Sequence, residues 1–99
     1  SDVTFTPDSA DLSDKADAQL QTVADQIAQH PDGGSLDIVG HTDDVADDAH
    51  NQKLSEDRAQ AVADRLGKLT DLSAWTQNVV GKGETEPKAA NDTEESFNA

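Results

Sequence analysis

The sequence predicts an α/β domain in which two helices pack on one small sheet. Apolar residues recur every three or four positions in two stretches, as they do on one face of a helix. Three shorter stretches are β-prone and alternate with the helical ones. The order strand, helix, strand, helix, strand is typical of helices that cover a sheet, and a length of 99 residues fits one such domain over residues 1–99.

The first part of the chain predicts a strand and a helix with clear ends. Residues 3–6 alternate and are expected to form a short strand. The helix is expected to begin after Ser13, a plausible N-cap followed by acidic residues, which the helix dipole favours in the first turn. Residues 31–34, Pro-Asp-Gly-Gly, end it. Its apolar stripe consists of Leu12, Ala16, Leu20, Val23, Ala24, Ile27 and Ala28.

The middle of the chain predicts a second strand and a second helix, joined by a polar loop. The strand covers residues 36–40 and the loop covers 41–50. The helix is expected over 54–69, with Ser55 as a candidate cap. Its apolar stripe consists of Leu54, Ala61, Val62, Leu66 and Leu69.

The last part of the chain predicts one more strand, over residues 75–80, which the Gly-Lys-Gly-Glu segment 81–84 ends. From Thr85 onward the chain is polar and predicts no further element.

Composition excludes several classes of partner. The chain has 21 acidic and 7 basic residues, a formal net charge of −14, which repels nucleic acid and anionic membrane surfaces. No apolar run approaches the length of a membrane span, so the domain itself is not expected in the membrane. Cysteine is absent, which excludes disulfides and thiolate metal sites but is compatible with either cytosol or envelope. Most of the acid excess is interpreted as solvated surface.

The loop that leaves the second strand is the candidate site, because α/β folds usually place sites at strand ends. Asp43 lies in this loop, although a turn or cap role would also explain it. Arg58 falls on the apolar stripe of the second helix, where a guanidinium needs a partner or a polar pocket; a structural ion pair is the alternative. Asn51 joins the same face if the helix extends back that far. Arg65 lies seven residues further along the same helix and is expected to have a surface or structural role.

A carboxylate and a guanidinium in one small pocket would suit a zwitterion, with Asp43 on its ammonium and Arg58 on its carboxylate. An enzyme is the least supported interpretation, because His41, Asp43 and Ser55 lack a nucleophile elbow. Metal binding has some support, but the loop lacks the spacing of a calcium loop or a zinc site. The residues considered for it are His41, Asp43, Asp47, Asp48 and His50.

The combined motif resembles the OmpA-like peptidoglycan-binding domain over nearly the whole chain. It begins with Phe5, Ser9 and Leu12 and continues with Gly-His-Thr-Asp at 40–43 and Asn51. It then includes Leu54, Ser55, Arg58, Ala59, Val62 and Leu66, and ends with Gly-Lys-Gly-Glu at 81–84 and Pro87.

The resemblance implies a noncatalytic domain, without a cofactor, in the extracytoplasmic cell envelope. It would anchor a larger protein to the cell wall by holding the diaminopimelate of the peptidoglycan stem peptide. Asp43 would take the free amino group and Arg58 the carboxylate. The further ligand contacts implied are Asn51, Asp8, Thr42 and Val45.

The sequence departs from the family pattern at Asp44, Ala46 and Lys82, and above all at its end. The family continues with an Asn-Arg-Arg-Val-like last strand, so this chain is expected to be C-terminally incomplete and to lack that strand. The alternative function is a ligand-free module that uses the acidic loop 43–48 for protein interaction or divalent cations.

Overall fold

The computed structural model describes residues 2–5, 9–42, 48–83 and 91–97; for residues 2, 91, 92 and 94–97 it describes the backbone alone. The described elements are β1 (Asp2–Val3), α1 (Asp14–Ala28), β2 (Gly34–Gly40), α2 (Asp48–Leu69), β3 (Trp75–Gly81) and β4 (Asn91–Phe97).

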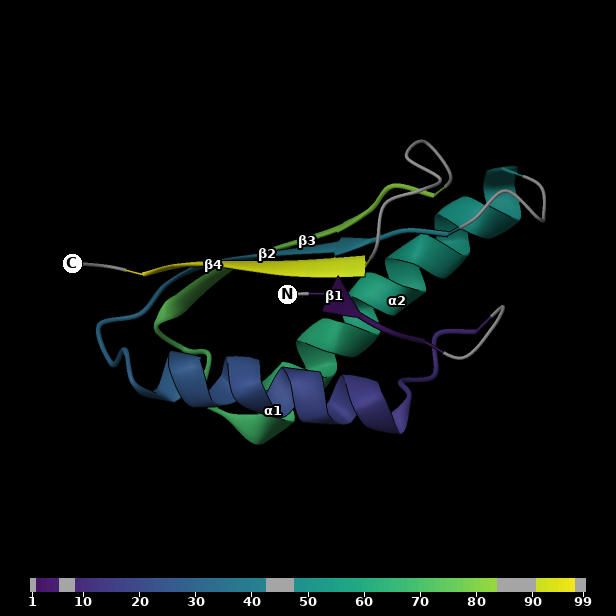
Figure 1. Ribbon diagram of the computed structural model, residues 1–99. Helices are drawn as coiled ribbons and strands as arrows, with labels where there is room; N and C mark the ends of the chain where they lie inside the picture. The colour runs from purple at the N-terminus through teal and green to yellow at the C-terminus, as the bar shows by residue number, and fades with distance from the viewer. Residues whose placement is uncertain (1, 6–8, 43–47, 84–90, 98–99) are drawn as a thin grey trace.

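The strands form one mixed sheet in the order β1-β4-β2-β3. β2 is parallel to β3, whereas β4 is antiparallel to both β1 and β2. Both helices lie on the same side of the sheet (Figure 1), so the sheet has one covered face and one open face. The predicted fold class, two helices packed on a small mixed sheet, is confirmed.

The prediction that no further element follows Thr85 is wrong. Residues Asn91–Phe97 form β4, which lies between β1 and β2 (yellow in Figure 1). Asn, Asp and Glu are depleted in strands, so this segment has little strand propensity of its own. It is a strand because it pairs along β2, with Gly34 opposite Phe97 and Val39 opposite Asp92. Thr93, opposite Ile38, is fully buried.

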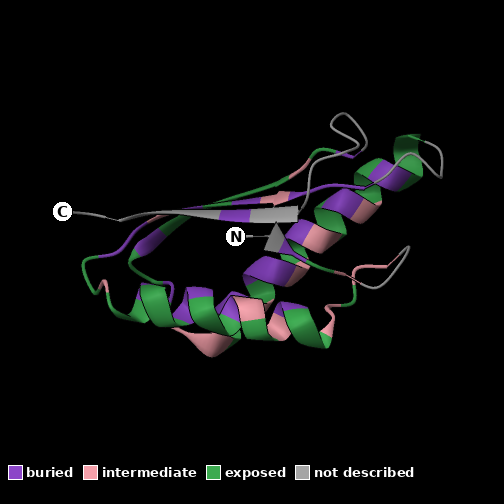
Figure 2. Ribbon diagram, in the orientation of Figure 1, coloured by how far each residue is buried: buried purple, intermediate pink, exposed green. Residues whose placement is uncertain are grey.

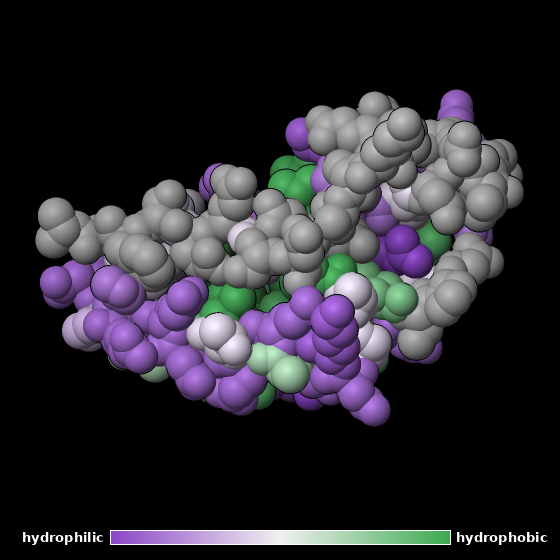
Figure 3. Space-filling view, viewed as in Figure 1, coloured by the Kyte–Doolittle hydropathy of each residue, from purple (hydrophilic) through white to green (hydrophobic). Residues whose placement is uncertain are grey.

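The core lies between the sheet and the two helices. Ser13 caps α1 as predicted, because its Oγ accepts a hydrogen bond from Ala16 N at 3.0 Å. The side of each helix that faces the sheet is buried and the opposite side is exposed (Figure 2). Hydrophilic residues cover the outer side of α1 (Figure 3). Among the described residues, the apolar residues with 0% exposure are Ala16, Leu20, Leu36, Ile38 and Leu66.

The second helix begins six residues earlier than predicted, at Asp48 instead of Leu54. Ser55 is therefore not its cap but a fully buried residue inside it. The earlier start also brings Asn51 onto the buried face of α2, as the site prediction required. No helix in the described part of the chain is both long and apolar enough to cross a membrane.

Candidate functional site

The N-terminal half of α2 lies directly against the ends of β2 and β3 (Figure 1). The contact at Gly40 is so close that a Cβ atom there would lie 1.9 Å from the carbonyl oxygen of Ser55. At Gly81 a Cβ atom would lie 2.4 Å from the backbone nitrogen of Glu56. Only glycine permits this approach, because the obstructing atoms belong to the helix backbone. The segment that leaves β2 therefore starts from a fixed point beside α2.

Arg58 joins three separate segments of the chain. Its Nε donates to the carbonyl oxygen of Ser9 at 2.8 Å, and its Nη1 donates to that of His41 at 3.0 Å. The guanidinium also lies over the ring of Phe5, 5.3 Å from the ring centroid, within cation–π range. The side chain is half-buried on the apolar stripe of α2, and these groups provide the polar surroundings that its position required.

His41 and Thr42, the two residues after β2, are both 5% exposed. The backbone N–H of Thr42 donates to the carbonyl oxygen of Gly83 at 2.9 Å. Its hydroxyl oxygen is buried and has no hydrogen-bond partner within the part of the chain that is described. Asn51, 1% exposed, lies in α2 near the same end of the sheet.

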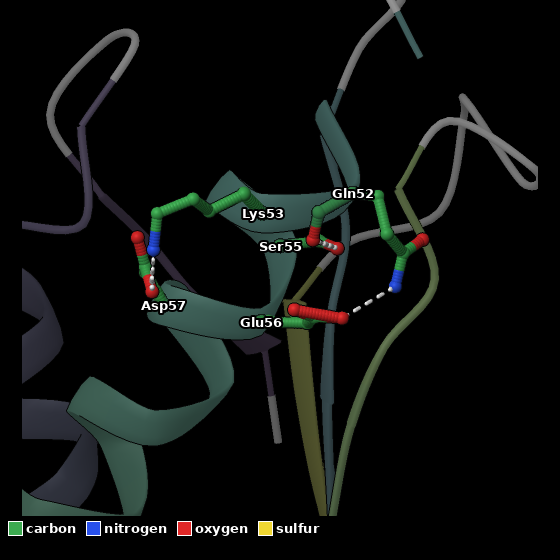
Figure 4. A network of polar contacts seen from close by, with 5 residues as sticks. All are labelled: Gln52, Lys53, Ser55, Glu56 and Asp57. Carbon is green, nitrogen blue, oxygen red and sulfur yellow. Dashed lines mark hydrogen bonds and ion pairs between the residues drawn. The ribbon is translucent and has the colours of Figure 1, made fainter. Parts of the chain in front are cut away.

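Side chains in the N-terminal half of α2 form a polar network (Figure 4), and two of them also contact the end of β3 and the residues after it. The Ser55 hydroxyl donates to the carbonyl oxygen of Gln52 at 2.8 Å and accepts from the backbone N–H of Gly83 at 2.8 Å. The Gln52 amide donates to the carbonyl oxygen of Gly81 at 2.7 Å and to a carboxylate oxygen of Glu56 at 3.1 Å. These contacts tie the segment after β3 to the helix that carries Arg58.

Three of the predicted site residues therefore lie at one end of the domain: Arg58 and Asn51 on α2, and Thr42 after β2. Asp43, Val45 and Asp8 lie outside the described residues. Arg65 has the structural role expected of it, because its Nε lies 3.3 Å from a carboxylate oxygen of Asp17 on α1.

Of the five residues considered for cation binding, His41, Asp48 and His50 are described, whereas Asp43 and Asp47 lie outside the described residues. His41 is buried after β2, whereas Asp48 and His50 are exposed in the first turn of α2. Among the described residues, no group of three His, Asp or Glu could hold a metal ion.

The contacts of Ser55 and Gln52 with the segment after β3 were missed by sequence reasoning. Ser55 and Gly83 are 28 positions apart, so no local pattern connects them. One signal was available: Asn51, Ser55 and Ala59 recur every four residues and define a face of small and polar residues that continues into the apolar stripe.

Comparisons with known proteins identify relatives over nearly the whole chain. A family model described as the OmpA family matches residues 4–99. Outer membrane porin F of Pseudomonas aeruginosa is 42% identical over 94 residues, which are 95% of this chain and 27% of the porin. The chain spans between 27% and 37% of the length of this protein and two further curated relatives.

Two solved structures share the fold. One is described as the cell wall anchor of the type VI secretion system (T6SS) from Pseudomonas aeruginosa; it is 36% identical, with a TM-score of 0.64 over 88% of this chain and 62% of that one. The other is the peptidoglycan-associated lipoprotein from Burkholderia pseudomallei, 26% identical, with a TM-score of 0.75 over 97% of this chain and 88% of that one. These relatives are cell-envelope proteins, in agreement with the expected extracytoplasmic location.

Proposed function

The chain belongs to the OmpA family, and we propose that it is a noncatalytic domain that binds peptidoglycan noncovalently. In this role it would anchor a larger envelope protein to the cell wall. The two solved relatives support the proposal, since one is described as a cell wall anchor and the other as peptidoglycan-associated. Because the chain spans only part of its curated relatives, the architecture of the larger protein belongs to the proposal as well.

The ligand group proposed is the diaminopimelate of the stem peptide. The observation that carries this is the placement of Arg58, whose guanidinium is fixed against the carbonyl oxygen of His41, two residues before Asp43. A guanidinium has five N–H donors in a planar fork, and the carbonyl oxygens of Ser9 and His41 orient that of Arg58. A fork of this kind suits a carboxylate, which it binds through charge-assisted hydrogen bonds.

The second half of the clamp is Asp43, which would bind the free amino group of the same ligand. A zwitterion satisfies both charges at once, so neither is left without a counter-charge when the ligand displaces water. Thr42 would contribute its buried hydroxyl, which has no partner among the described residues. Asn51, Asp8 and Val45 would supply further contacts. The chemistry is recognition, with no bond made or broken.

A binding assay with purified cell-wall sacculi tests the site. Arg58→Ala should abolish co-sedimentation, whereas Arg65→Ala should bind like the wild type. Arg65 is a matched control, because it is the other arginine of α2 and its described ion pair joins α2 to α1 at the protein surface. Free diaminopimelate should compete for wild-type binding. A stem peptide with lysine in place of diaminopimelate should compete weakly, because the lysine side chain ends in an ammonium group and offers no carboxylate to Arg58. Undiminished binding by Arg58→Ala would refute the site.

The alternative function, a cation-binding or protein-interaction module, is motivated by the four Asp residues at 43, 44, 47 and 48. Calorimetry separates it from the proposal. Heat on adding diaminopimelate supports the clamp, and heat only on adding calcium or zinc supports the alternative. A wall-digestion assay tests the noncatalytic part of the proposal, since released fragments would contradict it.

A further inference from the structure

We infer that Ser55 is a positioning residue for Thr42, the residue before the proposed ligand contact Asp43, and that it acts through the backbone of Gly83. The inference deepens the proposed function and rests on it for its binding consequence. Its structural part is that Ser55 holds the backbone of Thr42 in place, and this part rests on the hydrogen bonds alone.

The Ser55 hydroxyl is oriented by the helix that carries it. Its proton is donated to the carbonyl oxygen of Gln52 one turn earlier, at 2.8 Å. This bond fixes the hydroxyl rotor and leaves the oxygen as an acceptor. The backbone N–H of Gly83 donates to this oxygen at 2.8 Å. The side chain of Ser55 is fully buried, and water cannot replace it as the acceptor without entering the core.

Gly83 in turn contacts Thr42, the second residue after β2. Its carbonyl oxygen accepts the backbone N–H of Thr42 at 2.9 Å. Ser55 therefore holds the N–H of Gly83, and the carbonyl oxygen of the same residue holds Thr42, the residue immediately before Asp43. A second backbone bond, from Lys82 N to the carbonyl oxygen of Gly40 at 2.9 Å, keeps the two segments in register.

The same helix holds the preceding residue as well, because Arg58 donates to the carbonyl oxygen of His41. The His41–Thr42 pair is thus attached to α2 at two points, directly through Arg58 and indirectly through Ser55 and Gly83. Ser55 and Arg58 are three residues apart and so lie on neighbouring positions of one helix face. The helix that supplies the guanidinium also holds the two residues that precede Asp43, which is the pre-organisation that the proposed two-charge clamp requires.

Amide hydrogen exchange tests the structural part without any ligand. In Ser55→Ala the amides of Gly83 and Thr42 should exchange about tenfold faster than in the wild type. The amides of α1 should show no such selective increase: any change in their exchange rates should be the same for all of them. Ile27→Val is the matched control, because it weakens the core at the C-terminal end of α1, away from the site. Equal exchange at Gly83 and Thr42 in the two variants would overturn the inference.

Sacculus binding tests the functional part. Ser55→Ala should bind about tenfold more weakly, as expected when one buried supporting hydrogen bond is lost, and Ile27→Val should bind within about twofold of the wild type. Wild-type binding by Ser55→Ala, with binding lost in Arg58→Ala, would overturn the positioning role and leave the proposed function intact. Wild-type binding by Arg58→Ala would overturn the proposed diaminopimelate clamp, and absence of binding by the wild type would overturn the proposed function. In either case the exchange rates would still decide whether Ser55 holds Thr42.

Gln52→Ala keeps the test decisive if Ser55→Ala does not fold. Gln52 is exposed and donates to the carbonyl oxygen of Gly81, so its loss should loosen the same segment without opening the core. We expect faster exchange at Gly83 and binding weakened about threefold; unchanged values in both measurements would contradict the inference.

Discussion

Replacing Gly40 by alanine should destabilise the domain far more than its small size suggests. The added Cβ would lie 1.9 Å from the carbonyl oxygen of Ser55, 2.9 Å from its carbonyl carbon and 3.1 Å from the backbone nitrogen of Ala59. All three atoms belong to the backbone of α2, so no side chain can rotate away and the helix must move off the strand. Overpacking of this kind costs about 3 kcal/mol, near the upper end of its usual range.

For a domain of this size, a loss of about 3 kcal/mol lowers the melting temperature by about 12–24 °C. Gly67→Ala is the matched control, because it is the same substitution within α2 at a glycine whose added Cβ has no atom within 4 Å. That variant should gain about 0.5–1 kcal/mol from helix propensity. Thermal unfolding of both variants measures the difference. A Gly40→Ala variant as stable as Gly67→Ala would show that the backbone of α2 does not approach Gly40 as closely as described.

Three further predictions concern stability and titration. Ser13→Ala should lose about 1 kcal/mol of unfolding free energy, because it removes the hydroxyl that caps α1 at Ala16 N. Ile38→Ala, at a fully buried position of β2, should lose about 2–5 kcal/mol. The backbone N–H of Ser73, aided by its hydroxyl, holds the pKa of Asp71 below its ordinary value of 3.8, so nuclear magnetic resonance should find its titration midpoint below that value. The corresponding stabilisation is complete above pH 3.8 and is lost as the pH falls through the lowered pKa.

Each of these predictions has its own control. Thr22→Ala, on the exposed side of α1, should change stability by under about 0.5 kcal/mol; an equal loss in Ser13→Ala and Thr22→Ala would contradict the cap. Ile38→Ala with a denaturation midpoint like the wild type would contradict the position of the core. An Asp71 midpoint at 3.8 or above would contradict its contact with Ser73.

The two helices show how far the sequence predicts local structure. α1 was predicted because its apolar spacing and its cap at Ser13 agree. The start of α2 was missed because residues 48–53 are mostly exposed and lack an apolar stripe; the one buried member of that stretch is Asn51, a polar residue. The helix extends through them because its buried face continues one turn further than hydrophobicity alone reveals.

The strand β4 and the candidate site show why other features could not be predicted from the sequence. β4 is specified by the two strands that it joins, and partner strands distant in sequence leave no local periodicity. Arg58 could be predicted because a charged residue on an apolar stripe is an anomaly that calls for an explanation. Ser55 is not an anomaly of this kind. Its four-residue spacing with Asn51 and Ala59 indicates which helix face it lies on, but its contact with Gly83 spans 28 positions and leaves no local pattern.

The central place of β4 has a consequence for how the domain is made. In the described sheet, β1 pairs with β4 alone, and β2 meets β4 along its whole length except at Gly40. A ribosome delivers residues 91–97 after every other described element has emerged. Until then β1 lacks the strand that it pairs with in the described sheet, and β2 has one unpaired edge, so the described sheet forms only once β4 inserts. Because that step joins the first and last described strands, we expect it to be the slow step of folding and the stage at which the chain is most exposed to wrong pairing.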